Sequence, residues 1–447
     1  MALTGIQIYK LLPQTNCKDC GDPTCLAFAM KLAAGKAELS KCPHVSSEAT
    51  EKLAEASAPP IRVVELGEGD VAFKVGGETV KYRHEKTFVN PTGLLVYLSN
   101  ATDGAKVDAE LKNLNEVKFE RVGYTLQANG AYLRDEKGDK DSFLALVGKV
   151  AGATKKAIIV DSANLDTVKA AAAALKGRKF AVSGPAAADL AALSKELGCA
   201  VVAKGASTEA VADEGAKLVA ADVKTVILDA GWTKIRDALT GNIAFRRGAL
   251  DKKQREVGFP SIAFACGMTT DFYTEMAYAN LLIDKYAGLV VISTLDPAAV
   301  LPTTVNRLNI YTDPQRPMTM DQGIYAINNP GPDSPVIITT NFALTYFVVS
   351  AEVEASRVPT WLLIMDTEGM SVLTAWSAGK FVADAMAPFV KKSGITEKVN
   401  HRKIIIPGFV AQLSGEFQEE LGEGWEVIIG TREAGDIPKF LKDLTAK

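Results

Sequence analysis

The sequence is poor in histidine and has no long hydrophobic run, and its charges nearly cancel. Its 447 residues include three histidines, and 50 Lys and Arg against 53 Asp and Glu leave a net charge of −3. A chain this close to neutral lacks the basic footprint of nucleic-acid-binding proteins. Its longest apolar runs, such as residues 288–293, are far shorter than the ~20 residues that span a bilayer, and no basic segment precedes an apolar stretch as in a signal peptide. We therefore expect a cytoplasmic protein that binds neither membranes nor nucleic acid.

Cysteine is scarce beyond the first 42 residues. The remaining 405 residues contain only Cys199 and Cys266. This uneven distribution excludes the disulfide framework of a small secreted domain, and clustered cysteines in an intracellular chain indicate a metal centre. The four clustered cysteines follow the spacing C-x2-C-x4-C-x16-C, with a proline directly after the last; they are Cys17, Cys20, Cys25 and Cys42.

Four thiolates at this spacing predict one [4Fe–4S] cluster, because iron–sulfur clusters take four Cys ligands. Structural zinc is the alternative, although it more often uses two C-x2-C pairs or recruits histidine. His44 is a possible substitute ligand, but its place next to Cys42 requires no role. A cluster alone indicates electron transfer, and a chain of this length implies that the cluster reduces something held elsewhere.

The chain divides into modules by composition. Residues 1–57 form the predicted cluster domain, and the Pro-containing break at 57–60 opens a linker with hairpins over 58–90. Residues 91–312 repeat short apolar strands followed by helices, which predicts a parallel sheet covered on both faces, most simply a (β/α)8 TIM-like barrel. A doubly wound open sheet is the alternative. The eight predicted strands are 94–99, 120–124, 157–161, 180–183, 200–204, 225–229, 261–265 and 289–293, with a loop over 127–140.

Prolines between 311 and 332 separate this region from a last α/β unit over 320–447. Four predicted strands, 336–339, 361–365, 403–406 and 426–429, alternate with helices over 342–356, 371–392, 410–421 and 437–444. Four such repeats are too few to close a barrel, so an open Rossmann-like sheet is predicted.

The cysteine spacing, the barrel-like middle and the segment Thr339-Thr-Asn341 … Glu368-Gly-Met-Ser-Val-Leu-Thr374 resemble one family over essentially the whole chain. It is the large (gamma) subunit of the corrinoid iron–sulfur protein of the acetyl-CoA (Wood–Ljungdahl) pathway. The resemblance implies a base-off cobamide, a vitamin B12-type corrinoid, in the C-terminal domain and a small barrel subunit as heterodimer partner. It also implies a methyl carrier between methyltetrahydrofolate:corrinoid methyltransferase and acetyl-CoA synthase, a subunit of a methyltransferase system and not a complete enzyme.

The histidines are consistent with a cobalt that has no protein nitrogen ligand. His44 belongs to the cluster module, His84 to the hairpins, and His401 precedes the strand 403–406, whereas ligands of open α/β sheets bind beyond the carboxyl ends. A free lower face raises the Co(II)/Co(I) potential toward the reach of a low-potential cluster, which is tuning that a protein supplies.

Small and hydroxyl residues after the four C-terminal strands are the candidates for contacting the corrin and its nucleotide tail. Helix N-caps and turns are the alternative reading of the same residues. Trp376 is predicted to be core, while Phe342 and Tyr346 could line the apolar side of the macrocycle. The candidates are Thr339, Thr340, Asn341, Gly369, Met370, Ser371, Val372, Leu373, Thr374, Gly408, Gly430, Thr431, Arg432, Glu433 and Ala434.

Polar residues also follow the barrel strands, where barrel enzymes keep catalytic groups: Asn100, Asp161, Asp229 and Cys266. A fold is no evidence of activity, and the resemblance implies a scaffold. Two other functions stay open. One is a pterin-dependent corrinoid methyltransferase with an active barrel; the other is a corrinoid-free iron–sulfur electron-transfer protein with a flavin on the C-terminal sheet.

Overall fold

The computed structural model describes residues 4–33, 37, 39–46, 49–50, 53 and 59–446. Its contacts divide the chain into two compact units. The first comprises Met1–Lys81, Val89–Val117 and Ala128–Arg307, and the second Tyr82–Phe88, Lys118–Gln127 and Leu308–Lys447. Among the described residues, no helix combines the length and the apolar character that crossing a bilayer requires.

The N-terminal module is built from two short helices, α1 (Gly5–Tyr9) and α2 (Cys25–Ala33), and the 3-10 turn η1 (Leu39–Lys41). Thr4 and Gln7 form a capping box that fixes the start of α1. The small core contains Ile8, Leu12, Phe28, Ala29 and Leu53. Residues 34–36, within the helical stretch seen in the sequence, and residues 57–58 of the predicted linker lie outside the described residues.

Eight parallel strands follow one another in chain order around the central domain, as the sequence predicts for a (β/α)8 barrel. A bridge between Leu228 and Ser261 joins the two end strands of the sheet, so the barrel is nearly closed. The strands are β3 (Gly93–Ser99), β6 (Gly130–Arg134), β7 (Ala157–Asp161), β8 (Ala181–Ser183), β9 (Ala200–Lys204), β10 (Val226–Asp229), β11 (Ile262–Phe264) and β12 (Leu289–Ile292).

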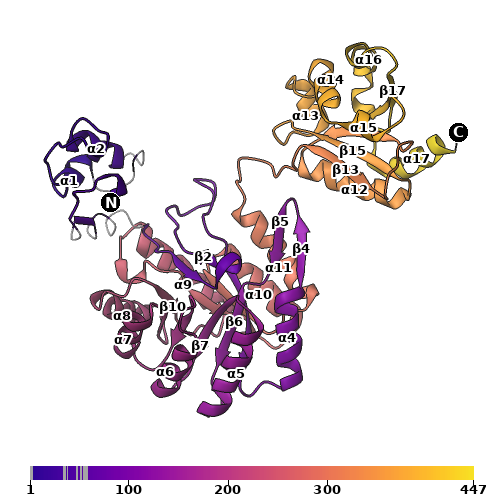
Figure 1. Cartoon of the computed structure of the whole chain (residues 1–447). Coiled ribbons are helices and arrows are strands. Elements are labelled where there is room, and N and C mark those ends of the chain that lie inside the picture. Colours follow the sequence, from indigo (N-terminus) through magenta and orange to yellow (C-terminus); the bar gives the residue numbers. More distant parts are fainter. Residues whose placement is uncertain are drawn as a thin grey trace. The chain divides into compact units, whose positions relative to one another are not determined.

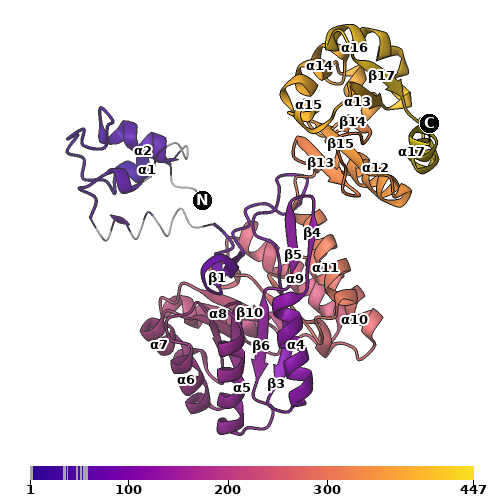
Figure 2. The ribbon, with the colours of Figure 1, turned by 45° about the vertical axis from the view of Figure 1, so that its right-hand side comes forward.

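Helices surround these strands (Figures 1 and 2). They bury their apolar stripes against the sheet, which leaves polar faces outside. In chain order they are α4 (Gly104–Glu116), α5 (Lys140–Ala153), α6 (Leu165–Ala174), α7 (Ala187–Leu197), α8 (Thr208–Ala220), α9 (Ile235–Leu250), α10 (Phe272–Asp284) and α11 (Pro297–Tyr311).

A hairpin of β1 (Val64–Leu66) and β2 (Phe73–Val75) fills the amino-terminal end of the barrel. Val64, Leu66 and Val75 belong to the same buried cluster as the inward-facing strand residues. The N–H of Gly67 donates to the carbonyl of Lys179, just before β8, at 2.8 Å. The amino-terminal end of the barrel is therefore packed with apolar side chains. The β1–β2 hairpin itself agrees with the hairpin expected from the sequence.

The prediction of a barrel strand at 120–124 is wrong. Those residues belong to an antiparallel hairpin of β4 (Lys118–Arg121) and β5 (Tyr124–Gln127), and the second barrel strand is β6, inside the segment predicted as a loop. β6 begins at Gly130, where a Cβ atom would lie 2.2 Å from the carbonyl oxygen of Ala157. Only glycine permits this approach, so the residue that makes the strand possible also resembles a loop signal.

The C-terminal sheet has the order β13-β15-β14-β16-β17, with β13 antiparallel at its edge. Four parallel strands match the predicted ones, whereas the edge strand was not predicted. The bounds are β13 (Gly323–Ile327), β14 (Val336–Thr340), β15 (Thr360–Met365), β16 (Lys403–Ile406) and β17 (Glu426–Ile429). Because the chain continues from β14 to β15 on one side and reaches β16 on the other, a topological switch point lies between β14 and β16.

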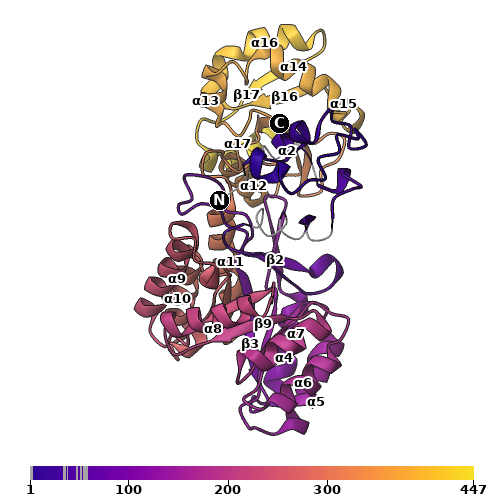
Figure 3. The same ribbon diagram turned by 90° about the vertical axis from the view of Figure 1, so that its left-hand side faces the viewer.

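Helices cover both faces of this sheet (Figure 3 gives a second view). One face packs against α12 (Ala343–Ser356) and α17 (Ile437–Thr445). The other packs against α13 (Val372–Ser377), α14 (Ala383–Lys392) and α16 (Ser414–Leu421). The helix predicted over 371–392 is broken, because Gly379 takes a φ of +70° and buried Phe381 fills the core between α13 and α14.

Candidate functional site

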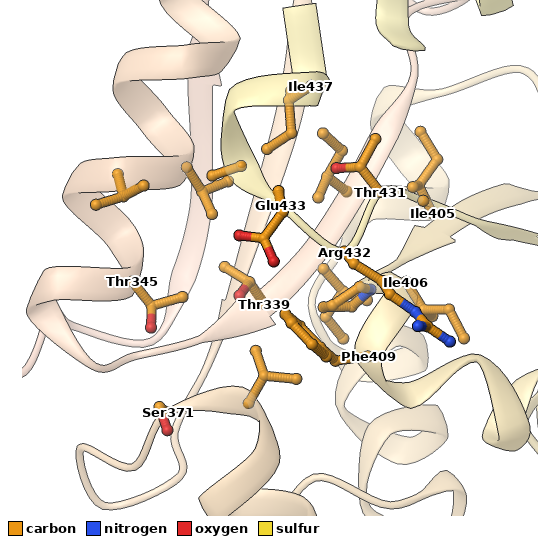
Figure 4. Close-up of a pocket in the computed structure, with 18 of the residues that line it drawn as sticks. Thr339, Thr345, Ser371, Ile405, Ile406, Phe409, Thr431, Arg432, Glu433 and Ile437 are labelled. Carbon is orange, nitrogen blue, oxygen red and sulfur yellow. The ribbon is translucent and has the colours of Figure 1, made fainter.

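The C-terminal unit contains a pocket of about 410 Å³. It opens at the carboxyl ends of β14, β16 and β17, between α12 and the segment that leads into α17 (Figure 4). This is the crevice in which open α/β sheets bind their ligands, beside the switch point. The sequence argument that placed the site beyond the strand ends agrees with this position.

The wall of the pocket is mainly apolar, with a few polar groups at its edge. Leu344 and Val348 stand one turn apart on α12, and they are 61% and 44% exposed although they line the pocket. Aliphatic side chains left open beside a concave site are typical of a surface that a ligand covers. The polar groups that line the pocket are Thr339, Thr345, Ser371, Thr431, Arg432 and Glu433.

Two neighbouring hydroxyls at the end of β14 have no hydrogen-bond partner among the described residues. They belong to Thr339 and Thr340, which are 1% and 0% exposed. An unsatisfied buried hydroxyl costs about 1–3 kcal/mol, so such groups call for an explanation. Successive strand residues face opposite sides of the sheet, and only Thr339 lines the pocket. Its hydroxyl is therefore available to a ligand there.

Asn341 organises the loop after β15. Its Oδ1 accepts hydrogen bonds from the N–H groups of Thr367 (3.0 Å) and Gly369 (3.1 Å), and its Nδ2 donates to Asp366 at 2.9 Å. Gly369 has a φ of +74°, which favours glycine. Asn341 and Gly369 thus shape the loop that leads into α13, and neither lines the pocket.

Two glycines bring the loops after β16 and β17 close together. A Cβ on Gly408 would lie 2.7 Å from the carbonyl oxygen of Gly430, and one on Gly430 would lie 2.9 Å from that of Ile406. The N–H of Gly408 donates to the carbonyl of Thr431 at 2.9 Å. Any side chain at either position would push apart the backbone that forms one wall of the pocket.

In the N-terminal module, three of the four cysteines surround one small core. Cys25 is buried in it, and Cys20 and Cys42 pack against it. The loop that carries Cys17 is tied to Cys25 by Asn16, whose side chain accepts from the N–H of Cys25 at 2.8 Å and whose own N–H points at Cys25 Sγ at 3.4 Å. The fold thus brings the cysteine-bearing segments to one place.

The backbone of this loop has an unusual conformation. Gln14, Asn16 and Lys18 all have φ between 50° and 69°, and Gly21 follows at 82°. Alternation of left-handed with ordinary residues turns successive N–H groups inward, and such nests bind anions, including the sulfides of iron–sulfur centres. The donor set therefore fits an anionic cluster held by thiolates.

Asp19 is a group near the cysteines that sequence reasoning missed. A ligand atom from each of Cys17, Asp19 and His44 lies within 4.8 Å of the other two. His44 Nε2 contacts Asp19 Oδ2 at 2.6 Å, and this hydrogen bond, followed by one from Cys17, lowers the pKa of Asp19 below its usual value. His44, given no role from the sequence, is therefore paired with Asp19.

Comparison with known proteins covers both regions. Residues 63–441 match the family model of the CO dehydrogenase/acetyl-CoA synthase delta subunit, and residues 12–44 match a model described as a putative Fe-S cluster. The chain is 40% identical over 447 residues to the corrinoid/iron-sulfur protein large subunit of Moorella thermoacetica, with 99% of each chain covered.

The chain belongs to the family of corrinoid/iron–sulfur protein large subunits. Archaeal relatives carry the name acetyl-CoA decarbonylase/synthase complex subunit gamma. One, from Methanocaldococcus jannaschii, is 30% identical over 470 residues, covering 99% of this chain and 96% of the relative. Another, from Methanosarcina acetivorans, is 32% identical over 460 residues, covering 98% and 97%. The family resemblance drawn from the sequence is confirmed.

The predicted contact residues divide into two sets. Those that line the pocket are Thr339, Ser371, Val372, Leu373, Gly430, Thr431, Arg432, Glu433 and Ala434. Those that do not line it are Thr340, Asn341, Gly369, Met370, Thr374 and Gly408. Thr374 is close to the edge, since its hydroxyl pairs with that of Ser371 at 3.0 Å. Ser371 is the N-cap residue of α13, although its side chain makes no capping hydrogen bond.

The sequence reasoning missed the contribution of α12 and α17. The residues concerned are Leu344, Thr345, Val348, Val349, Ile437 and Phe440. A signal was present, because residues 343–349 are apolar on more sides than one buried face requires.

The aromatic predictions had mixed outcomes. Trp376 is 38% exposed, so its assignment to the core is wrong. The short helix α13 ends one residue later, which leaves the indole at the surface. Phe342 does line the pocket, whereas Tyr346 packs into the core against Tyr325, with ring centroids 5.2 Å apart.

His401 lies at the amino end of β16, as predicted, and is engaged there. Its Nε2 is 3.0 Å from the carbonyl oxygen of Ser334, and its Nδ1 accepts from the N–H of Lys403. None of the three histidines of the chain lines the pocket.

Proposed function

We propose that this chain is a methyl-group carrier that holds a cobamide on its C-terminal sheet and a [4Fe–4S] cluster in its N-terminal module. When bound, the cobamide supplies a Co(I) centre that accepts and releases a methyl group, and the cluster supplies the electron that returns inactive Co(II) to Co(I). The chain is then the cobalt-bearing subunit of a methyltransferase system and not a complete enzyme.

The observation that carries this proposal is the pocket at the strand ends. Its volume of about 410 Å³ and its mainly apolar wall suit the aromatic lower base of a nucleotide tail, and it has one buried hydroxyl without a described partner, at Thr339. The exposed apolar residues Leu373 and Trp376 beside it offer a surface on which a flat macrocycle can lie.

The absence of histidine from the pocket lining supports a base-off cobamide. Because His401 is engaged at the opposite end of β16, no histidine of the pocket lining would be available to cobalt, and the pocket residues would hold the lower base instead. The protein thereby leaves the metal easier to reduce, which suits a carrier that a low-potential cluster must reactivate.

Cys17, Cys20, Cys25 and Cys42 would hold the cluster. The inward-turned backbone N–H groups of residues 14–21 favour its negative charge. The donor set and the match of residues 12–44 to an iron–sulfur model favour this over zinc.

The partners follow from the role. The Moorella relative is named a large subunit and the archaeal relatives are named subunits of a complex. We therefore propose that the chain forms a heterodimer with a small subunit, receives the methyl group from methyltetrahydrofolate through a methyltransferase, and delivers it to acetyl-CoA synthase.

The test compares two cobalt ligands on the full chain: cobalamin, which has the nucleotide tail, and cobinamide, which lacks it. Val348→Trp would fill the pocket from α12, and Ala351→Trp adds the same side chain to an exposed position of the same helix outside the pocket. We expect Val348→Trp to weaken cobalamin binding at least tenfold and to leave cobinamide binding unchanged, while Ala351→Trp changes neither.

Titration followed by the corrin absorption spectrum measures both affinities. Equal affinity of the wild-type chain for cobalamin and cobinamide would contradict a role of the pocket in holding the tail. Failure of the chain to bind either corrinoid would contradict the proposed function as a whole.

A further inference from the structure

A layer of polar side chains closes the interior of the barrel at its carboxyl end. Tyr132, Ile159 and Ala181 belong to the buried interior cluster, and the residue two positions further along each strand faces the same way. The registers of β3, β6, β7 and β8 place Ser99, Arg134, Asp161 and Ser183 side by side in that order. The register of β9 and β10 pairs Lys204 with Asp229. The layer consists of Ser99, Arg134, Asp161, Ser183, Lys204 and Asp229.

Asp161 holds the two cations of this layer in place. It is 3% exposed, accepts a hydrogen bond from the hydroxyl of Tyr132 at 2.7 Å, and receives Lys204 Nζ at 2.5 Å. Arg134 Nε lies 3.8 Å from Asp161 Oδ2, the oxygen that also accepts from Tyr132. The side chains of Lys204 and Arg134 are 33% and 50% exposed, so each keeps N–H donors that a ligand can approach.

Asp229 is the second carboxylate of the layer, and it is far less satisfied. It is 6% exposed, and its Oδ1 accepts one hydrogen bond, from the N–H of Gly231 at 2.9 Å. The described residues provide no hydrogen bond or ion pair to Oδ2. Burial raises the pKa of this carboxyl above its usual value. A buried carboxylate with a free oxygen is costly unless something completes it.

The two ends of the barrel therefore differ in kind. The amino end is filled by the apolar β1–β2 hairpin, as expected of a scaffold. The carboxyl end keeps the two cations and two carboxylates of the layer and a third carboxylate, Glu136, which accepts hydrogen bonds from the hydroxyls of Ser99 and Tyr97 at 2.7 Å each. Half-buried Tyr97 and Phe264 flank this layer and pack against Tyr132, with ring centroids 6.2 Å and 4.8 Å away. Barrels bind their ligands at this end.

The complement of this layer is a planar molecule that carries both donors and acceptors. The carboxylate of Glu136 is already satisfied by the hydroxyls of Ser99 and Tyr97, so the groups left to meet a ligand are the N–H donors of Lys204 and Arg134 and the free oxygen of Asp229. Lys204 and Arg134 offer N–H donors to a carbonyl oxygen, and Asp229 offers an acceptor to N–H groups. A ring amide, in which C=O stands beside N–H, presents both along one edge, as in guanine and in pterins.

We propose that the carboxyl end of the barrel binds such a ring-amide heterocycle, with its carbonyl oxygen toward Lys204 and Arg134 and its N–H groups on Asp229. This is a binding site and not a catalytic one. Burial raises the pKa of the nearby Cys266 thiol to about 12, which keeps it protonated and unreactive at neutral pH. The proposal stands independently of the cobamide pocket.

The experiment titrates the full chain with pterin, whose own fluorescence reports binding, and then competes with guanine. The key variant is Asp229→Asn. Its amide oxygen can still accept the hydrogen bond from the N–H of Gly231, but its NH2 group then faces the N–H donors of the ligand and cannot accept from them. Asp222→Asn is the matched control, because Asp222 is exposed before β10 and pairs with Lys224. Lys204→Met tests the donor side.

We expect saturable binding of pterin, guanine or both, and the stronger of the two identifies the natural class. Asp229→Asn and Lys204→Met should weaken it at least tenfold, the effect of losing a hydrogen bond to a charged group, while Asp222→Asn leaves it unchanged. Unfolding temperatures measured alongside separate loss of binding from loss of fold. Absence of saturable binding of both compounds, or equal affinity of a folded Asp229→Asn variant, overturns the proposal.

Discussion

The replacement of Thr339 by valine separates a ligand contact from a structural one. Valine keeps the shape and the β-branching of threonine and removes only the hydroxyl, whose oxygen is buried without a partner among the described residues. In the cofactor-free chain this loss relieves an unsatisfied polar group, so the free energy of unfolding of the C-terminal unit should rise by about 1–2 kcal/mol. In the loaded chain the same change removes a hydrogen bond to the cobamide.

That lost bond sets the expected effect on binding. A net hydrogen bond is worth about 0.5–1.5 kcal/mol, which corresponds to roughly a 2- to 12-fold weaker cobalamin affinity. Thr340→Val is the matched control, since Thr340 is the next residue of β14, is equally buried and unpartnered, and does not line the pocket. Thr340→Val should raise the free energy of unfolding by a similar amount and leave the cobalamin affinity unchanged.

The assay combines denaturant unfolding of apoprotein with cobalamin titration of each variant. If Thr339→Val destabilises the apoprotein by 1 kcal/mol or more, the hydroxyl has a protein partner and the reasoning fails. If Thr339→Val has the same cobalamin affinity as the wild type, the Thr339 hydroxyl does not contact the cofactor.

The remaining predictions concern the cluster, the cobalt and the pocket wall. Cys20→Ala should lose the cluster but retain corrinoid. After chemical pre-reduction this variant should still accept a methyl group at near wild-type rate, but it should not recover from Co(II) with a protein electron donor. Cys199→Ala, remote in sequence from the cluster cysteines, should keep the cluster, the corrinoid, methyl acceptance and recovery from Co(II). His401→Ala should leave the electron paramagnetic resonance spectrum of the Co(II) state unchanged, without nitrogen superhyperfine splitting, and a nitrogen triplet that disappears in this variant would place the histidine on cobalt. Gly408→Ala should destabilise the C-terminal unit by about 2 kcal/mol or more through its backbone clash, whereas Gly415→Ala, in open space on α16, should stabilise it slightly in the same unfolding assay.

Buried strands were predictable because their residues are apolar on both faces. The strands 157–161 and 200–204, for example, have the predicted bounds, since a parallel strand covered on both faces reads as a continuous apolar run. The second barrel strand was not predictable in this way, because it starts at a glycine needed for contact with Ala157. The half-buried edge strand 323–327 is an apolar run as well, but it lies within the proline-containing stretch between 311 and 332 that reads as a break between two units.

The site was predictable where it depends on strand ends and not where it depends on helix faces. Thr339 and residues 430–434 follow from topology alone, because carboxyl ends of parallel strands meet at one edge. Leu344 and Phe440 line the same pocket, yet their spacing is equally typical of core-facing helix residues. Tertiary packing, which the sequence pattern does not specify, decides whether such a residue meets the core or a ligand.

The most direct test of the proposed function is the absorption spectrum and metal content of the chain purified without air. We expect a corrinoid spectrum, about one cobalt, and about four irons with four sulfides per chain, held by the four N-terminal cysteines. A flavin spectrum without cobalt, or stoichiometric zinc without labile sulfide, would contradict the account.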